Sequence, residues 1–436
     1  MVAARPTHPM RSWYSLVAAV VFVSTAGAAD LDALLANPKL WTFSQEEFQK
    51  LPETRGFQWT SEAHDSARAI RQKLYGLPVV EVVVRFDAGK VASVTPVIYA
   101  RGDAGDLSEE EFKKVVTTAS EALNTNTKIQ FTVRGKDASN AVKAEGLIWQ
   151  TPAAKYLLEY SFTKEVKTRN IPFRAEFVRL EVKPPEQHGS LLANVSLTGR
   201  LRFSGPAHIK KDPVSGDVLI PDVPMVDQGQ KGYCAVACAE RMMRYYGVPT
   251  DANEIAQIAN SDAEGGTSAE AMFEALKKLG QRLKVRVRAV EQFDVKQILN
   301  LINDYNRAAK REKAPPLPDQ GRMLDVAHIF RSMDSGLLKE VRTKNKAEVT
   351  RFQADIQKHI DQGIPLLWSV MLGVVKEKQI PQASGGHMRL IIGYNTKTNE
   401  IMYTDSWGAG HELKRMALDD AWTMTTGLTA IEPSAQ

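Results

Sequence analysis

The chain has 436 residues, of which 25% are charged and 43% are hydrophobic, and these ordinary globular proportions exclude a wholly disordered or collagen-like protein. At roughly 100–200 residues per domain, the length predicts two or three domains. The net charge of +5 is small and spread along the chain, so nucleic acid is not expected as a partner.

The start of the chain has the pattern of a secretory signal. An apolar, uncharged run at 13–26 follows Arg5 and Arg11 and is followed by small residues. This run is too short to span the core of a bilayer comfortably, which takes roughly 20 residues, although an uncleaved membrane anchor is the alternative. We therefore predict a signal peptide over 1–28 and export to the periplasm or the extracellular space. No stable membrane association is expected after the signal is cleaved.

The segment 29–203 is predicted to form a separate α+β domain, whose role the sequence does not indicate. Residues 30–76 carry apolar residues at helical spacing and predict short helices. The pattern then changes to two strands that meet in a hairpin at Asp87–Lys90. A helix over 107–123 and four further strand-like runs follow, which predicts helices packed on an antiparallel sheet.

Proline and glycine residues are frequent over 204–222, and we predict a linker there. The segment 223–436 has a different pattern, in which helices come first and strands later. One helix is predicted to begin near Tyr233 and to stop at Gly247, a typical glycine C-terminus. A proline-rich break marks an insertion near 307–345. This half is therefore also α+β, with a helical part followed by an antiparallel sheet.

The two cysteines, Cys234 and Cys238, lie four residues apart, a spacing that places both on one face of a helix. Cys234 lies where the predicted loop becomes the helix. The unpaired N–H groups and the positive end of the helix dipole there favour an ionised thiolate. Such a nucleophile needs a histidine partner, a group that orients the histidine and donors for the oxyanion. Gln228, six residues upstream, can supply one donor and the Cys234 backbone N–H the other.

Two predicted strands bring a histidine and an aspartate together. If Tyr394 lies opposite Ile401 in the hairpin, paired positions sum to about 795, and His387 then faces position 408, close to Asp405. Asp405 can therefore accept a hydrogen bond from His387 and orient its ring, which is the third role in a catalytic triad.

Each of these residues also has a structural interpretation. Cys234 alone is more often a buried small hydrophobe, and Cys238, one turn further along, is expected in the core; a redox pair of the two is a minor alternative. Gln230 is the rival of Gln228 for the oxyanion role. His359 and His411 have no matching surroundings. Two cysteines and scattered histidines do not make a zinc site, so neither a metal nor an organic cofactor is expected.

The segments QGQKGYCAVACAERMMRYYG and GGHMRLIIGYNTKTNEIMYTDSWG resemble the papain-like cysteine peptidases. They are most similar to the bacteriocin-processing, double-glycine branch and its stand-alone relatives. The resemblance covers about 223–432 without the insertion, and it implies a papain-like fold. It also implies Gln228 as the oxyanion residue, Cys234 as the nucleophile, His387 as the base and Asp405 as its orienter. Ala235 departs from the family, which has a glycine directly after the cysteine.

The predicted function is that of a secreted thiol hydrolase, a cysteine peptidase that cleaves peptide bonds through an acyl-enzyme. Its expected partner is a peptide or protein substrate. An acyl transferase or transamidase of the same clan shares the chemistry up to the acyl-enzyme and is the first alternative. A non-catalytic binding module that keeps the fold is the second.

Overall fold

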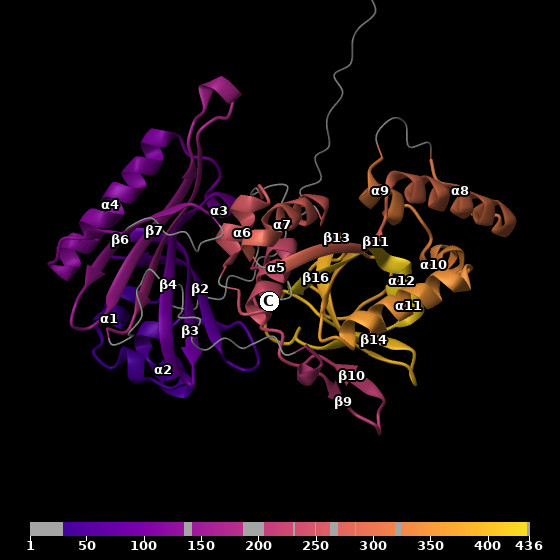
Figure 1. Ribbon diagram of the computed structural model, residues 1–436, viewed down its shortest axis with the longest axis horizontal. Helices are drawn as coiled ribbons and strands as arrows, with labels where there is room; N and C mark the ends of the chain where they lie inside the picture. The colour runs from indigo at the N-terminus through magenta and orange to yellow at the C-terminus, as the bar shows by residue number, and fades with distance from the viewer. Residues whose placement is uncertain are drawn as a thin grey trace, which may run out of the picture.

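The computed structural model describes residues 29–134, 142–185, 205–229, 232–248, 250–261, 269–283, 285–318 and 324–433. The predicted signal peptide over 1–28 lies outside these residues. Two eight-stranded sheets dominate the structure, one in each half of the chain. Helices α5 (Cys234–Tyr245), α6 (Ala252–Ile258) and α7 (Ala269–Leu283) lie between them (Figure 1). The α+β class predicted for both halves is confirmed.

The first sheet is antiparallel throughout and has the strand order β1-β2-β3-β4-β8-β7-β6-β5. Its strands are β1 (Gln58–Trp59), β2 (Ser66–Leu74), β3 (Leu77–Asp87), β4 (Lys90–Ala100), β5 (Thr132–Val133), β6 (Ala144–Gln150), β7 (Lys155–Thr163) and β8 (Arg174–Lys183). The predicted hairpin is present, because Asp87 pairs with Lys90 where β3 turns into β4.

Within the described residues, four α-helices accompany this sheet, namely α1 (Leu31–Ala36), α2 (Gln45–Lys50), α3 (Arg101–Ala104) and α4 (Glu109–Thr127). Short 3-10 turns lie at Leu40–Thr42, Pro52–Thr54 and Lys167–Arg169. Two of the helices begin with a capping box, in which a serine and the glutamate three residues later satisfy each other's backbone N–H groups. The pairs are Ser44 with Glu47 in α2 and Ser108 with Glu111 in α4.

The helical prediction over 30–76 is wrong for its last part, because Ser66–Leu74 forms strand β2. Its residues pair with β3, from Ser66 opposite Arg85 to Leu74 opposite Leu77. Buried and exposed side chains alternate only in part along β2, and Arg71 at φ 55° interrupts the alternation. The local pattern was therefore ambiguous, and pairing with a long neighbouring strand decided the conformation.

The second sheet has the order β11-β16-β12-β13-β10-β9, and β14 pairs with β13 on one side and β15 on the other. Its strands are β9 (Lys210–Lys211), β10 (Asp217–Leu219), β11 (Val285–Gln292), β12 (Leu366–Leu372), β13 (Gly385–Asn395), β14 (Glu400–Thr404), β15 (Lys414–Ala417) and β16 (Thr425–Pro433). All of its pairings are antiparallel, as predicted.

Part of the segment predicted as a linker, 204–222, belongs to this second sheet. Strand β10 pairs with β13, with Val218 opposite Tyr394, and β9 pairs with β10. The breaker residues form the turn of this hairpin, where Asp212 accepts a hydrogen bond from the backbone N–H of Val214 and Gly216 adopts φ +86°. Proline and glycine here therefore indicate a tight turn.

Eight helices are described in the second half: α5 (Cys234–Tyr245), α6 (Ala252–Ile258), α7 (Ala269–Leu283), α8 (Val295–Glu312), α9 (Val326–Arg331), α10 (Ser335–Thr343), α11 (Lys346–Ile360) and α12 (Leu418–Met424). A 3-10 turn lies at Gly205–His208. The predicted insertion near 307–345 contains α9 and α10, and Phe330 and Leu338 from these helices are buried in the core. This segment is therefore an integral part of the packed half.

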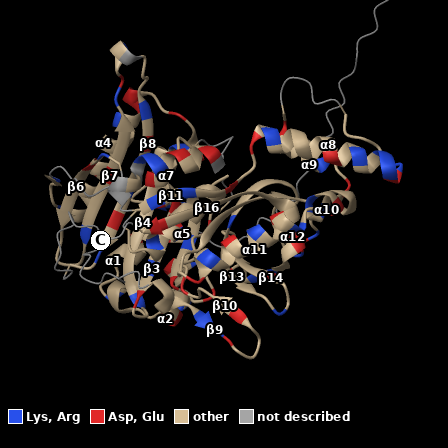
Figure 2. Ribbon diagram, turned by 45° about the vertical axis from the view of Figure 1, so that its right-hand side comes forward, with Lys and Arg blue, Asp and Glu red and all other residues tan. Residues whose placement is uncertain are grey.

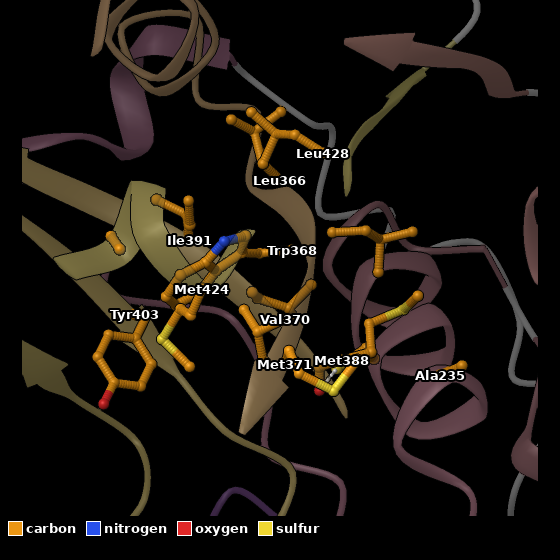
Figure 3. Packing of buried hydrophobic residues seen from close by; sticks show 14 of the residues in the cluster. Ala235, Leu366, Trp368, Val370, Met371, Met388, Ile391, Tyr403, Met424 and Leu428 are labelled. Atoms are coloured by element: carbon orange, nitrogen blue, oxygen red, sulfur yellow. Dashed lines mark hydrogen bonds between the residues drawn. The ribbon is translucent and has the colours of Figure 1, made fainter. Parts of the chain in front are cut away.

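Buried hydrophobic side chains form two clusters, one within 29–182 and one within 220–431. In the second cluster, side chains of β12 and β13 pack against α5, and Figure 3 shows Met371 and Met388 directed toward the helix that carries Ala235. Acidic and basic residues are interspersed over both halves (Figure 2). Within the described ranges, no helix is long and apolar enough to cross a membrane.

Candidate active site

Cys234 is the first residue of helix α5, close to where the sequence predicted the loop to end. The side chain of Tyr233, the N-cap residue, forms no capping hydrogen bond with the backbone N–H groups of the first turn. The Cys234 side chain is partly buried against the second core. The helix ends before Gly247, which adopts φ +70°, as expected for a glycine C-terminus.

The hairpin of β13 and β14 has the predicted register next to its turn, where Tyr394 lies opposite Ile401. An irregularity between Ile391 and Gly393 then shifts the pairing by one residue, so that Leu390 lies opposite Thr404. His387 is the first buried residue of β13, and Asp405 directly follows the last residue of β14. Their side chains meet, with 2.6 Å between His387 Nε2 and Asp405 Oδ1.

His387 is held as a protonated ring. Burial lowers its pKa, but the hydrogen bond to Asp405 and the interaction with the Cys234 thiol outweigh this effect and raise the pKa to about 9. His387 Nδ1 is buried, and it forms no hydrogen bond of ordinary geometry with any of the described residues. Because Asp405 occupies Nε2, Nδ1 is the nitrogen open to the thiol. The three predicted triad residues therefore interact around one imidazole.

The Asp405 carboxylate is completely buried, and three donors hold it. Besides His387, the backbone N–H of Ser406 donates to Oδ1 at 2.9 Å, and Arg389 Nε donates to Oδ2 at 2.7 Å. Burial raises the pKa of Asp405, but the hydrogen bonds and the positive charges of His387 and Arg389 lower it overall. The carboxylate is therefore ionised and oriented toward the imidazole.

Gln228 lies beside this pair through two hydrogen bonds with Ser406. Its backbone N–H donates to the Ser406 carbonyl at 2.8 Å, and the Ser406 hydroxyl donates to Gln228 Oε1 at 2.7 Å. Acceptance at Oε1 fixes the side-chain amide, so its Nε2 donor has a defined direction. Gln230, the rival candidate, lies outside the described residues.

Two buried arginines, which the sequence predictions missed, support the site. Arg241 lies two turns beyond Cys234 in α5 and donates to the Asp405 carbonyl at 2.7 Å, to Thr404 Oγ1 at 2.6 Å and to the Pro224 carbonyl at 2.7 Å. It thereby joins the cysteine helix to the strand end that carries Asp405. A charged residue on an otherwise apolar helix face was the signal in the sequence.

Arg389, the second buried arginine, lies two residues after His387 and therefore on the same side of β13. Its guanidinium bridges Asp405 and Glu377, with 2.9 Å between Arg389 Nη1 and Glu377 Oε2. It also lies 4.8 Å from the centre of the Tyr403 ring. The sequence signal was a single charge within the apolar run MRLII.

Trp407 stacks on the His387 ring, with 4.3 Å between ring centres and 11° between planes. The stacked indole covers one face of the imidazole and restricts its rotation. Trp407 directly follows Ser406, so one short segment after β14 supplies the carboxylate, the contact to Gln228 and the indole.

Cys238 lies in the core, as predicted. It is fully buried, its thiol donates to the Met388 carbonyl at 3.3 Å, and burial raises its pKa. Ala235, which stands where the peptidases that the motifs resemble have a glycine, is also buried in the core and is accommodated within α5. His359 is buried near Glu432, and His411 packs edge-on against Trp407, so neither joins the triad.

The chemistry that this arrangement allows is nucleophilic attack at a carbonyl carbon. It combines a thiol at a helix N-terminus, a protonated imidazole held by a carboxylate and an oriented amide donor. No group of three or more His, Cys, Asp or Glu side chains that could hold a metal ion occurs in the described part of the chain.

Two family models match the second half of the chain. The model of the Peptidase C39 family matches residues 222–306, which include Cys234, and that of the Peptidase C39 like family matches residues 325–430, which include His387 and Asp405. No curated protein matches the chain. Among solved structures, a crystal structure of xylellain, a cysteine protease from Xylella fastidiosa, is 11% identical and has a TM-score of 0.27. That match covers 51% of this chain and 90% of xylellain.

The family matches and the α+β fold define the second half of the chain as a papain-like cysteine peptidase domain. Both matching models are of C39 peptidases, the family that the sequence motifs resemble.

Proposed function

We propose that this protein cleaves peptide bonds of a peptide or protein substrate through a triad of Cys234, His387 and Asp405. The observation that carries the proposal is the 2.6 Å contact between His387 Nε2 and Asp405 Oδ1. The Cys234 thiol interacts with the same imidazole and helps to raise its pKa. Gln228 is proposed as the oxyanion donor, together with the backbone N–H of Cys234.

In the first half of the reaction, the Cys234 thiolate attacks the carbonyl carbon of the scissile bond. The negative charge that develops on the carbonyl oxygen is stabilised by the Gln228 amide and the Cys234 N–H. The His387 imidazolium then donates its proton to the leaving amine, the C–N bond breaks, and a thioester acyl-enzyme remains.

In the second half, water attacks the thioester carbonyl while neutral His387 accepts a proton from it. The C–S bond then breaks, which releases the carboxylic acid and restores the thiolate and the imidazolium. Asp405 keeps the imidazole in the orientation needed for both proton transfers and stabilises its charged form.

A thiol-directed acyl probe tests this function when intact mass is measured for the wild type and for Cys234→Ala. The wild type is expected to gain one acyl group, and the variant none. Cys238→Ala is the matched control, since it removes the other cysteine and should leave acylation unchanged. A wild type that is not acylated, or acylation that persists in Cys234→Ala, contradicts the proposal. An added amine that becomes conjugated to the acyl group would indicate transfer in place of hydrolysis.

We also propose that the protein is exported, on the basis of the basic, apolar and small-residue pattern over 1–28. The mature chain is then expected to begin near Ala29. The mass of the protein purified from the exported fraction tests this prediction, since retention of residues 1–28 would contradict cleavage.

A further inference from the structure

The first half of the chain contacts the site at three places. These are the residue before Cys234, the loop that carries Gln228 and the loop that follows Asp405. Their partners all belong to the first half, including the edge of its sheet near β1 and β2.

The loop of Asp227, Gln228 and Gly229 is held from two sides. On one side, the Gln228 backbone N–H donates to Ser406, as described above. On the other, Arg68 of β2 approaches the loop, with 3.8 Å between Arg68 Nη1 and Asp227 Oδ2. Asp227 Oδ1 accepts a hydrogen bond from the Gly229 N–H at 2.8 Å and closes the turn.

The Arg68 guanidinium also packs directly on Gly229. It occupies the space that a Cβ atom at this position would need, and Gly229 adopts φ +67°, a conformation that side chains disfavour. The glycine therefore permits both the turn and the close approach of the arginine. Arg68 itself is fixed by Glu81 of β3, with 2.8 Å between Arg68 Nε and Glu81 Oε2. The loop is thus supported by a side chain that is anchored in a sheet.

The other two contacts join the first half to the residue before Cys234 and to the loop after Asp405. The Tyr233 hydroxyl occupies the space where a Cβ atom on Gly102 of α3 would lie, so the residue before Cys234 is packed on the first half. The backbone N–H of Glu62 donates to Glu412 Oε1 at 2.8 Å, in the loop after Asp405. The segments next to Cys234, Gln228 and Asp405 therefore each touch the first half.

Contacts that do not involve Arg68 also join the two halves of the chain. Arg179 forms ion pairs with Glu254 of α6 and with Asp251, the N-cap residue of that helix, and Arg174 donates to Asn260. These contacts lie at α6 and join the halves without touching the loop of Gln228. Arg68, in contrast, contacts the loop of Gln228 directly and can hold it in place.

We propose that Arg68 is a positioning residue for the oxyanion donor and that the first half of the chain thereby completes the active site. The inference rests on the proposed function, because it assigns a role toward Gln228. Loss of Arg68 frees the side of the loop opposite Ser406, and a displacement of about 1 Å at such a donor can cost up to roughly 100-fold in rate.

Two reactions of Cys234 in the full-length protein test this role. Acylation by a p-nitrophenyl ester passes through a tetrahedral oxyanion, whereas alkylation by iodoacetamide displaces iodide and forms no oxyanion. Arg68→Ala is expected to lower the acylation rate constant by about 10-fold and to leave the alkylation rate constant within twofold of wild type. Asp227→Asn keeps an acceptor for Gly229 but loses the charge that faces Arg68, and it should act in the same direction. This variant carries the test if Arg68→Ala does not fold. Arg174→Ala, the matched control, should change neither rate.

Unchanged acylation in Arg68→Ala, or in Asp227→Asn where that variant carries the test, overturns the inference. A parallel loss of alkylation, or an equal loss of acylation in Arg174→Ala, also overturns it, because either result indicates general loosening of the structure. If the wild type itself shows no acylation at Cys234, the peptidase function falls and the role of Arg68 with it. An acylated wild type together with a fully active Arg68→Ala overturns the role of Arg68 alone.

Discussion

Arg389 Nε donates to Asp405 Oδ2 at 2.7 Å, and both side chains are completely buried. The arginine is balanced by a second carboxylate, Glu377, which in turn accepts a hydrogen bond from the Tyr403 hydroxyl at 2.8 Å. The carboxylate proposed to orient His387 is therefore one end of a buried chain of charged and polar groups. Such a chain is stable only while every member keeps its partner.

Replacement of Arg389 should therefore destabilise the protein strongly. Arg389→Met leaves Asp405 and Glu377 as buried carboxylates without their shared cation, and we expect a loss of about 3–5 kcal/mol in the free energy of unfolding. Denaturant unfolding measures this loss. Arg286→Met, on the exposed part of β11, is the control and should stay within about 0.5 kcal/mol of wild type. A wild-type midpoint for Arg389→Met would contradict the structural role.

The pKa of His387 predicts the alkaline limit of activity. In the proposed mechanism, the imidazolium donates a proton to the leaving amine. Because the pKa of His387 is raised to about 9, the acylation rate on amide substrates should fall as the pH rises through about 9. The ordinary histidine pKa is about 6.5. The stability contributed by this shift is therefore fully present below that value and is lost as the pH rises through about 9.

Asp405→Asn tests the cause of this limit. The substitution removes the negative charge that helps to raise the pKa of His387, although the amide oxygen can still accept a hydrogen bond, so the alkaline limit should move to lower pH, and the maximal rate should fall as well. A pH profile of acylation compares the variant with wild type. An alkaline limit at the same pH in both proteins would show that Asp405 does not control His387.

Gln228→Ala should lower the rate of acylation by on the order of 100–1000-fold, because it removes one of the two proposed oxyanion donors. Alkylation of Cys234 by iodoacetamide should be unaffected, since that reaction develops no charge on a carbonyl oxygen. Gln230→Ala is the control and should acylate at the wild-type rate. If the acylation rate fell equally in the two glutamine variants, the assignment of the oxyanion role to Gln228 and not to Gln230 would be contradicted.

The two cysteines should differ in reactivity. Burial raises the pKa of Cys238 and shields its sulfur, whereas Cys234 is partly exposed. Brief treatment of the native protein with iodoacetamide is therefore expected to add one carboxamidomethyl group, and treatment after denaturation should add two. Peptide mapping assigns the first group to Cys234. Modification of Cys238 in the native protein would contradict the burial seen in the structure.

Much of the site was predictable because its parts are close in the sequence. The hairpin that brings His387 near Asp405 has only the short turn 396–399 between its paired strands, so the positions of its turn residues determine its register. The serine caps of α2 and α4 and the glycine stop of α5 are likewise short-range signals. The resemblance to papain-like cysteine peptidases added the expected roles of Cys234 and Gln228 to this geometry.

Other features depend on which surfaces meet, and neighbouring residues do not determine them. Strand β2 has a helix-like pattern, and its pairing with β3 decides its conformation. Arg241 and Arg389 bind groups more than ten residues away in the sequence, and Arg68 reaches a loop in the other half of the chain. Hydrogen-bonded turns and side-chain periodicity are properties of adjacent residues, so the sequence by itself determined the hairpin, the caps and the thiol at a helix start. Burial of a charge requires partners from distant segments, so only the tertiary structure decided how the triad is supported and which residues hold the loop of Gln228.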